Sequence, residues 1–84
     1  MIEVRPKLTV LSRDYCHLCE ELITALKRFQ GRYDFDIEVV DVDASPRLEE
    51  KWGDKVPVLL DGERELCRYH IDYDVVDARL ARMR

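Results

Sequence analysis

The spacing of apolar residues changes period several times along the chain, which is typical of a small α/β domain. The segment KLTVL, residues 7–11, is rich in β-branched and aliphatic residues and predicts a buried strand. From Leu18 onward the apolar residues follow a helical spacing: Leu22, Ala25, Leu26 and Phe29. Lys27 and Arg28 suit the negative C-terminal end of this helix, and Gly31 can supply a left-handed residue that ends it. The first third of the chain therefore predicts a strand followed by a helix.

The middle of the chain predicts a second strand and a short helix. The segment FDIEVVDVD, residues 35–43, is rich in Val and Ile, and its apolar face changes after Val39, as in a strand covered on both sides near its end. We expect this strand to lie parallel to the first. In the segment ASPRLEEKWG that follows, Ser45 can cap a helix, Pro46 fits its first position and Gly53 can end it.

The last third of the chain predicts a β-hairpin and a final helix. In KVPVLLDGERELCRY two apolar runs flank Asp61 and Gly62, a dipeptide favoured in two-residue hairpin turns, so the third and fourth strands should be antiparallel. Asp72 can cap the last helix, and Ile71 and Val76 are spaced as a hydrophobic staple. The buried face of that helix should contain Val76, Leu80 and Met83. The predicted order is βαβαββα, a four-stranded mixed sheet flanked by three helices.

The composition limits the size of the protein and the partners that it can bind. A chain of 84 residues buries only ~60% of its unfolded surface, so we expect a single monomeric domain over residues 1–84. With 14 Lys and Arg against 18 Asp and Glu, the net charge of −4 leaves no excess of cations for nucleic acid or an anionic membrane. Charges at Glu3, Arg5 and Lys7 interrupt any apolar signal segment, and no window has the ~18 apolar residues of a membrane span. We therefore expect a soluble, unexported, cytoplasmic protein.

Two cysteines stand three residues apart in DYCHLCEEL, where the first strand gives way to the first helix. Three roles are open to them: metal ligands, a structural crosslink or a redox reagent. Structural disulfides are rare in unexported proteins, which argues against the crosslink. A helix start stabilises a thiolate through unpaired N–H groups and the helix dipole, which would make Cys16 a nucleophile. Cys19, one turn deeper, could then attack the mixed disulfide and release the reduced partner.

Charged neighbours of the two cysteines would change the pKa of Cys16. Arg13 and His17 would lower it, whereas three acidic side chains would raise it by like-charge repulsion: Asp14, Glu20 and Glu21. Elsewhere, Cys67 is interpreted as a small buried residue of the fourth strand, and His70 as a surface residue. The acidic residues Asp36, Glu38, Asp41 and Asp43 are interpreted as solvated charge.

Three features together resemble the glutaredoxin-like branch of the thioredoxin fold, over essentially the whole chain. They are the βαβαββα order, the Cys16-x-x-Cys19 motif after the first strand, and Val56-Pro57 opening the third strand. A Cys-x-x-Cys motif alone is common, but its combination with this Val-Pro dipeptide is much more specific. The resemblance implies an enzyme, a thiol:disulfide oxidoreductase with a redox-active Cys16-Cys19 disulfide. It also implies that the Val56-Pro57 bond is cis and that its loop lies against that disulfide.

The resemblance also suggests substrate-binding residues. Arg13 stands three residues before Cys16, where many glutaredoxins have a basic residue, and Tyr15 places an aromatic side chain beside the motif. Val56 and Pro57 would contact the substrate, a disulfide-containing protein or a small thiol compound. The resemblance implies no bound cofactor or metal, and glutathione or a dithiol would be the reducing co-substrate.

The chain departs from the glutaredoxin pattern in two places. Glutaredoxins usually follow the fourth strand with Gly-Gly and an acidic pair that hold the γ-glutamyl end of glutathione, whereas this chain reads ELCRYHIDYD and has no glycine there. The dipeptide between the cysteines is His17-Leu18 instead of Pro-Tyr. We therefore expect weak use of glutathione, and better reduction by a dithiol or a thioredoxin-type reductase.

Two other functions fit parts of the same sequence. Cys16, Cys19, Cys67 and His70 supply three thiols and one imidazole, a set that can bind zinc tetrahedrally. The βαβ context favours redox chemistry over this zinc site. With inert cysteines, the domain would instead be a binding module that holds an extended peptide beside the Val-Pro dipeptide by strand-like hydrogen bonds.

Overall fold

The computed structural model describes residues 5–83 and has the predicted order of elements, with one short 3₁₀ helix added after the second strand. Glu3, one of the charges cited against an apolar signal segment, lies outside the described residues. Arg84, at the end of the predicted 1–84 domain, lies outside them as well. Within residues 5–83, no helix has the length and apolar character needed to cross a membrane.

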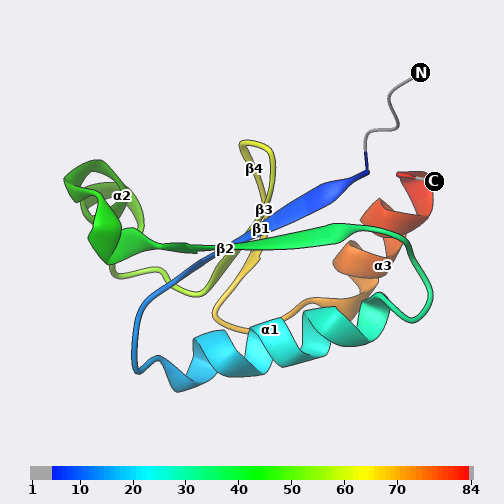
Figure 1. The fold of residues 1–84 in the computed structure, drawn as a ribbon, viewed down its shortest axis with the longest axis horizontal. Helices are drawn as coiled ribbons and strands as arrows, with labels where there is room; N and C mark the ends of the chain where they lie inside the picture. The colour runs from blue at the N-terminus through cyan, green and yellow to red at the C-terminus, as the bar shows by residue number, and fades with distance from the viewer. Residues whose placement is uncertain (1–4, 84) are drawn as a thin grey trace.

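Four strands form one mixed sheet in the order β2-β1-β3-β4 (Figure 1). They are β1 (Lys7–Ser12), β2 (Asp36–Asp41), β3 (Val58–Asp61) and β4 (Arg64–Arg68). The first two strands are parallel, as predicted, with Val10 opposite Val39. β3 pairs antiparallel with both β1 and β4, which confirms the hairpin. Because Leu11 lies opposite Val58, the end of β1 and the start of β3 meet at the same end of the sheet.

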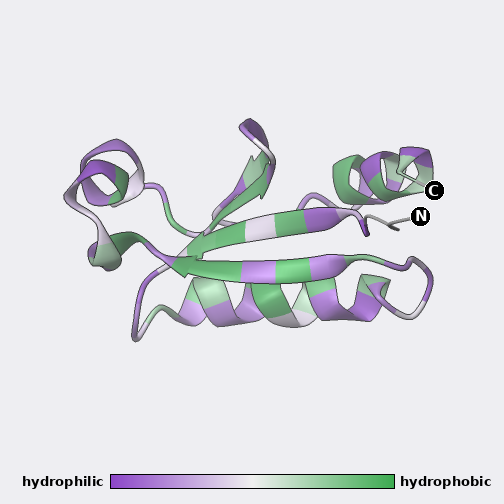
Figure 2. Cartoon of the chain, turned by 45° about the horizontal axis from the view of Figure 1, so that its top comes forward, coloured by the Kyte–Doolittle hydropathy of each residue, from purple (hydrophilic) through white to green (hydrophobic). Residues whose placement is uncertain are grey.

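Three α-helices and the 3₁₀ helix flank this sheet: α1 (His17–Phe29), η1 (Val42–Ala44), α2 (Pro46–Trp52) and α3 (Tyr73–Arg82). α1 runs along the sheet, whereas α2 and α3 lie at opposite ends of the molecule (Figure 1). Bands of hydrophobic and hydrophilic residues alternate along α1, as expected for a helix with one buried face (Figure 2). The predicted fold class is confirmed.

Two hydrophobic clusters hold the layers together. The larger joins α1 and α3 to one face of the sheet and contains Leu8, Val10, Leu22, Leu26, Phe29, Phe35, Leu59, Val76 and Leu80. The smaller contains Leu11, Val42 and Val58, with Leu48 and Trp52 of α2 packed against it. Since neighbouring strand residues such as Val10 and Leu11 point to opposite faces, α2 covers the face opposite α1 and α3. Both faces of β1 are therefore buried.

Two chain reversals differ from their sequence prediction. Gly31 does not have the predicted left-handed backbone. The C-cap of α1 is Gln30, which has a right-handed backbone. The central residues of the hairpin turn are Gly62 and Glu63, one position later than predicted. Gly62 has a φ of 62°, which glycine adopts without a steric penalty, and this fixes it as the first central residue.

The second strand is shorter than predicted and lies at an edge of the sheet. β2 ends at Asp41, because Val42 begins the 3₁₀ helix. Val39 is 51% exposed although its neighbour Val10 is fully buried, since β2 is an edge strand with a neighbour on one side only. The predicted coverage of both sides concerned the residues after Val39, where Val40 is half-buried and Val42 is fully buried. Ser45 precedes α2 as predicted, but its side chain makes no capping hydrogen bond.

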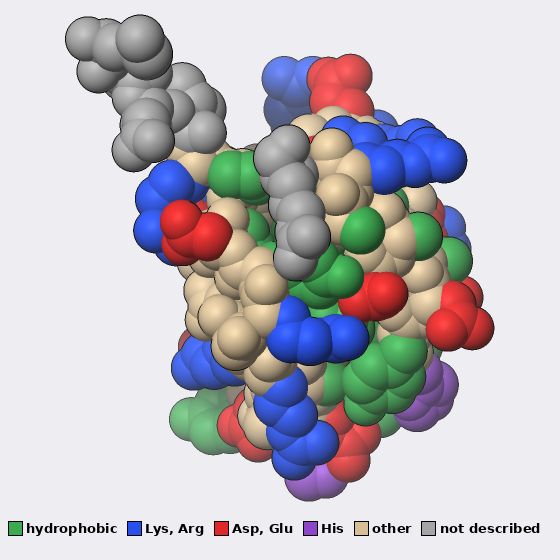
Figure 3. All heavy atoms as spheres, turned by 90° about the vertical axis from the view of Figure 1, so that its right-hand side faces the viewer, with side chains coloured by type: hydrophobic (Ala, Val, Ile, Leu, Met, Phe, Trp, Pro, Cys, Tyr) green, Lys and Arg blue, Asp and Glu red, His purple; other side chains and the backbone are tan. Residues whose placement is uncertain are grey.

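Charged side chains of both signs share the surface. On the face shown in Figure 3, Lys and Arg side chains are interspersed with Asp and Glu. Some of these charges join elements: the Arg79 guanidinium donates to Asp61, which links α3 to the end of β3. Tyr33 likewise donates its hydroxyl to Asp77 of α3 at 2.8 Å. The charged surface thus adds polar links to the packing of α3.

Candidate active site

The Cys16-x-x-Cys19 motif lies where β1 passes into α1. Tyr15 has a left-handed backbone with a φ of 59°, and its side chain is fully exposed. This conformation is uncommon for a residue other than glycine and costs on the order of 1–3 kcal/mol. The turn at Tyr15 leads directly into Cys16, which has an extended backbone and is the N-cap of α1. The strained turn therefore places the first cysteine at the positive end of the helix.

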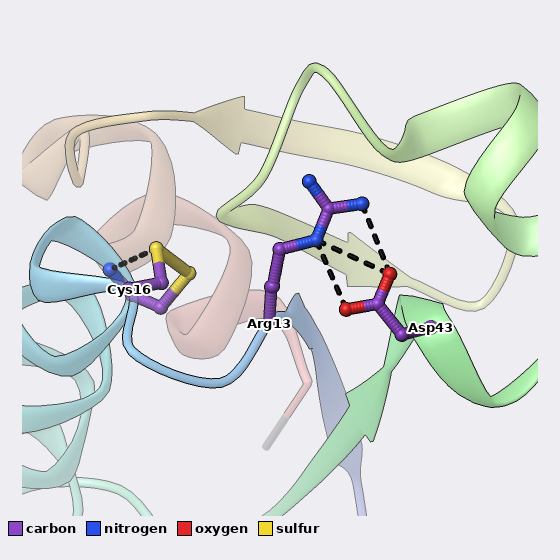
Figure 4. The surroundings of a disulfide bond; sticks show 4 residues. Arg13, Cys16 and Asp43 are labelled. Carbon is purple, nitrogen blue, oxygen red and sulfur yellow. Dashed lines mark hydrogen bonds and ion pairs between the residues drawn. A yellow bond between two sulfur atoms is a disulfide. The ribbon is translucent and has the colours of Figure 1, made fainter.

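The two cysteines form a disulfide bond (Figure 4). Their Cα atoms are 5.2 Å apart, within the usual range for a disulfide. Cys19 is only 2% exposed, whereas Cys16 is partly exposed. The backbone N–H of Cys19 donates to Cys16 Sγ at 3.2 Å. Cys16 is thus the sulfur that a substrate can reach, and the hydrogen bond and helix dipole would stabilise it as a thiolate after reduction.

The segment 54–57, called the proline loop here, leads into β3 at the same end of the sheet as the motif. Its Val56-Pro57 peptide bond is cis, the form that the resemblance implied. Pro57 is buried, and its carbonyl accepts the backbone N–H of Tyr69 at 2.7 Å. The Tyr69 hydroxyl also donates to the carbonyl of Asp54 at 3.2 Å. Tyr69 therefore holds both ends of the proline loop, a contact that the sequence did not predict.

Arg13 is engaged by two carboxylates. Its guanidinium donates to both oxygens of Asp43 at 3.1–3.3 Å and to Glu49 Oε1 at 3.1 Å. Figure 4 shows this side chain directed toward Asp43 and away from the disulfide. These two partners raise the pKa of Arg13, with Asp43 as the main cause. The charge expected to bind substrate is therefore already paired. Asp43 is exposed, in agreement with its interpretation as solvated charge, but it also pairs with Arg13.

His17 also has an acidic partner. Its Nε2 lies 3.3 Å from Glu21 Oε1, one helical turn further along α1, and the side chain is 83% exposed. The predicted role of His17 was to tune the first cysteine. Its side chain instead faces a carboxylate on the outer surface of α1.

The four residues of the zinc alternative do not form one site. Cys16 and Cys19 are bonded to each other, whereas Cys67 lies in β4 opposite Leu59. Cys67 is half-buried, and this burial raises the pKa of its thiol. His70 is exposed, as predicted. Across residues 5–83, no three His, Cys, Asp or Glu side chains come together as a metal-binding group.

A shallow groove beside the motif was not predicted. Two adjoining hollows, of about 320 and 370 Å³, share Glu21, Ala25 and Tyr73 in their walls. His17 lines one of them and Tyr69 lines the other. The groove lies between α1 and the segment that leads into α3, which are far apart in the sequence. No local pattern could therefore have indicated it.

The chain is similar to known sequences over most of its length. Residues 7–81 match the family described as "Glutaredoxin-like domain (DUF836)". A protein of Mycobacterium tuberculosis (strain ATCC 25618 / H37Rv), named "Uncharacterized protein Rv0508", is 30% identical over 83 residues. That alignment covers 93% of this chain and 86% of the relative.

Two solved structures have a similar fold. The solution NMR structure of protein Ne2328 from Nitrosomonas europaea is 41% identical, with a TM-score of 0.81, and the match covers 95% of this chain and 98% of that one. Thioredoxin 1 from Thermosipho africanus TCF52B is 25% identical, with a TM-score of 0.60 and coverage of 89% and 94%. The domain therefore has the thioredoxin fold, with its two cysteines bonded at the start of α1.

Proposed function

Because this chain belongs to the glutaredoxin-like family, we propose that it is a thiol:disulfide oxidoreductase that cycles between a Cys16-Cys19 disulfide and a dithiol. One observation carries the proposal: the disulfide joins a partly exposed N-cap sulfur to a buried one. Such an arrangement separates the sulfur that meets the substrate from the sulfur that resolves the intermediate.

In the proposed reductive direction, the Cys16 thiolate attacks one sulfur of a substrate disulfide. A bond forms between Cys16 Sγ and that sulfur, and the other substrate sulfur leaves as a thiolate that takes up a proton. Cys19 then loses its proton and attacks Cys16 Sγ, which forms the intramolecular disulfide and releases the second substrate thiol. Counting the proton that Cys16 gives up to solvent when it ionises, the two cysteines lose two electrons and two protons, and the substrate gains two of each.

The surroundings of Cys16 provide the proposed substrate contacts. Tyr15 is fully exposed beside the motif and can pack against an incoming chain. The backbone of Val56, in the proline loop, can form strand-like hydrogen bonds with an extended substrate. Pro57 has no N–H to compete for those bonds. We therefore assign the substrate to a disulfide-containing protein or a small disulfide, bound across Tyr15 and the proline loop.

The proposed electron donor is a dithiol or a thioredoxin-type reductase. The site needs no bound cofactor for this exchange, because both sulfurs belong to the chain. We propose that the protein works as a monomer in the cytoplasm, where such reductants keep thiols reduced.

Turnover of bis(2-hydroxyethyl) disulfide with dithiothreitol as the reductant tests the proposed function. Cys16→Ser should abolish turnover above the uncatalysed rate, because the attacking sulfur is lost. Cys19→Ser should accumulate a mixed disulfide at Cys16 that mass spectrometry detects. Cys67→Ser is the matched control and should turn over at the wild-type rate, since this thiol takes no part. If Cys16→Ser remained active, the assignment of Cys16 as the attacking sulfur would be wrong. If the wild-type protein gave no turnover above the uncatalysed rate, a binding function would be favoured.

A further inference from the structure

The basic side chains next to the motif already have carboxylate partners. Arg13, three residues before Cys16, binds Asp43 and Glu49. His17, the first residue of α1, faces Glu21. An anionic substrate would have to displace one of these carboxylates before it could pair with either side chain.

The cations beside the proline loop are paired in the same way. Lys55 Nζ lies 3.2 Å from Asp54. Arg68 donates two hydrogen bonds of 2.6 Å to the two oxygens of Glu65. Tyr69, the residue after Arg68, binds the proline loop, so this second pair lies close to the loop. Four charges, two of each sign, therefore cancel on this side of the site.

The N-terminus of α3 is also occupied. Among residues 5–83, this helix start follows the stretch where glutaredoxins have Gly-Gly, and a helix start of this kind can receive the carboxylate of a small anionic thiol. Asp72 Oδ1 already accepts the backbone N–H of Val75 at 3.1 Å. The carboxylate of this N-cap compensates the positive end of the helix and leaves little attraction for a second anion.

The uncompensated charge beside the disulfide is negative. Among residues 5–83, neither Asp14 nor Glu20 has an ion-pair partner, and both are exposed. Asp14 stands two residues before Cys16, and Glu20 directly follows Cys19. Arg28 also lines the groove, but it lies about 18 Å along the helix axis from Cys16, much further away than Asp14 or Glu20, so its attraction for an anion at the disulfide is weaker.

We infer that the Cys16-Cys19 site selects cationic disulfides over anionic ones, with Asp14 and Glu20 as the residues that set this preference. The inference rests on the proposed function and names its substrate class: disulfides flanked by Lys or Arg side chains. Glutathione, with two carboxylates and one ammonium group, falls in the disfavoured class. The exchange itself is the one described above, with two electrons and two protons passing to the substrate, and only the encounter depends on charge.

Three small disulfides of different charge test the inference with the reduced, desalted full chain. They are cystamine, a dication; bis(2-hydroxyethyl) disulfide, which is neutral; and 3,3′-dithiodipropionate, a dianion. Each rate is divided by the rate of the same disulfide with dithiothreitol, which removes differences in intrinsic reactivity. At an ionic strength of about 10 mM, the normalised rate with cystamine should exceed that with the dianion at least ~10-fold, and added salt should reduce this ratio.

Two further variants assign the preference to residues. Replacing both unpaired acids, Asp14→Asn with Glu20→Gln, should lower the cystamine-to-dianion ratio about 3-fold or more. Glu63→Gln removes one negative charge at the hairpin turn, away from the site, and should keep the wild-type ratio. Far-UV circular dichroism verifies that each variant is folded.

The outcomes separate the inference from the proposed function. A normalised ratio of one or less, with the neutral disulfide still reduced, overturns the charge preference alone. An unchanged ratio in the double variant overturns the assignment to Asp14 and Glu20. If the neutral disulfide also reacts no faster than expected for a free dithiol, the proposed function fails together with the inference.

Discussion

The three thiols of this chain differ because of where each lies in the fold. Cys16 caps α1, is partly exposed and accepts the N–H of Cys19. Cys19 is buried beneath it, at 2% exposure. Cys67 is half-buried in β4, where burial raises the pKa of its thiol. Exposure and hydrogen bonding therefore both favour Cys16 as the nucleophile.

In the reduced protein we expect Cys16 to be alkylated before the other two thiols. Its alkylation should begin at a lower pH than that of a free thiol, whose pKa is about 8.5. Labelling of Cys67 should become significant only at higher pH, because its raised pKa keeps it protonated near neutrality. A pH series of iodoacetamide labelling, followed by peptide mass spectrometry, measures each rate. Faster labelling of Cys19 or Cys67 near neutral pH would contradict these roles.

The sequence indicated the cysteine pair and the proline loop better than it indicated the residues that surround them. Cys16, Cys19 and the Val-Pro dipeptide stand in short motifs, so local spacing was sufficient to find them. The partners of Arg13 lie 30 and 36 residues away, and no local pattern links them to it. Tyr69 was missed for the same reason, since its contacts with the proline loop depend on the hairpin register.

The first helix is the element on which the site depends. α1 buries five residues, Cys19, Leu22, Ala25, Leu26 and Phe29. The last four belong to the helical spacing seen in the sequence, so periodicity predicted this face correctly. The edge position of β2 and the exact turn residues of the hairpin were not predictable, because strand order and register are set by contacts between distant segments.

Truncation of the buried face of α1 should destabilise the whole domain. Leu26 is fully buried in the larger cluster, and Leu26→Ala should lower the free energy of unfolding by about 2–5 kcal/mol. Thr24→Ala is the control on the same helix; its side chain is exposed, so a change within about 0.5 kcal/mol is expected. Urea unfolding of both variants gives the values. Equal effects would mean that this face of α1 is not the packed one.

At the scale of the whole molecule, the fold brings the motif, the proline loop and the α3 start to one region, where the basic side chains Arg13, His17, Lys55 and Arg68 each face a carboxylate. The charges near the motif are paired or negative. Side chains from Leu66 to Tyr69 also occupy the region where glutaredoxins have Gly-Gly. Both observations favour a donor other than glutathione.

We therefore expect slow turnover when the protein is coupled to glutathione and glutathione reductase, and faster turnover with a dithiol. A mixed-disulfide substrate reports both rates in the same assay, with an ordinary glutaredoxin as the positive control. The prediction is wrong if millimolar glutathione supports turnover equal to that of the control protein. In that case the missing glycines and the paired cations would not limit glutathione use.

The redox equilibrium of the Cys16-Cys19 pair tests the central claim most directly. The protein is equilibrated with mixtures of reduced and oxidised dithiothreitol and quenched by alkylation. Mass spectrometry then measures the fractions of oxidised and reduced protein. We predict one reversible two-electron transition, in which the ratio of oxidised to reduced protein changes tenfold for about every 30 mV. The transition should be absent in Cys16→Ser and unchanged in Cys67→Ser. A pair that does not interconvert reversibly, or a transition that requires Cys67, would contradict the account.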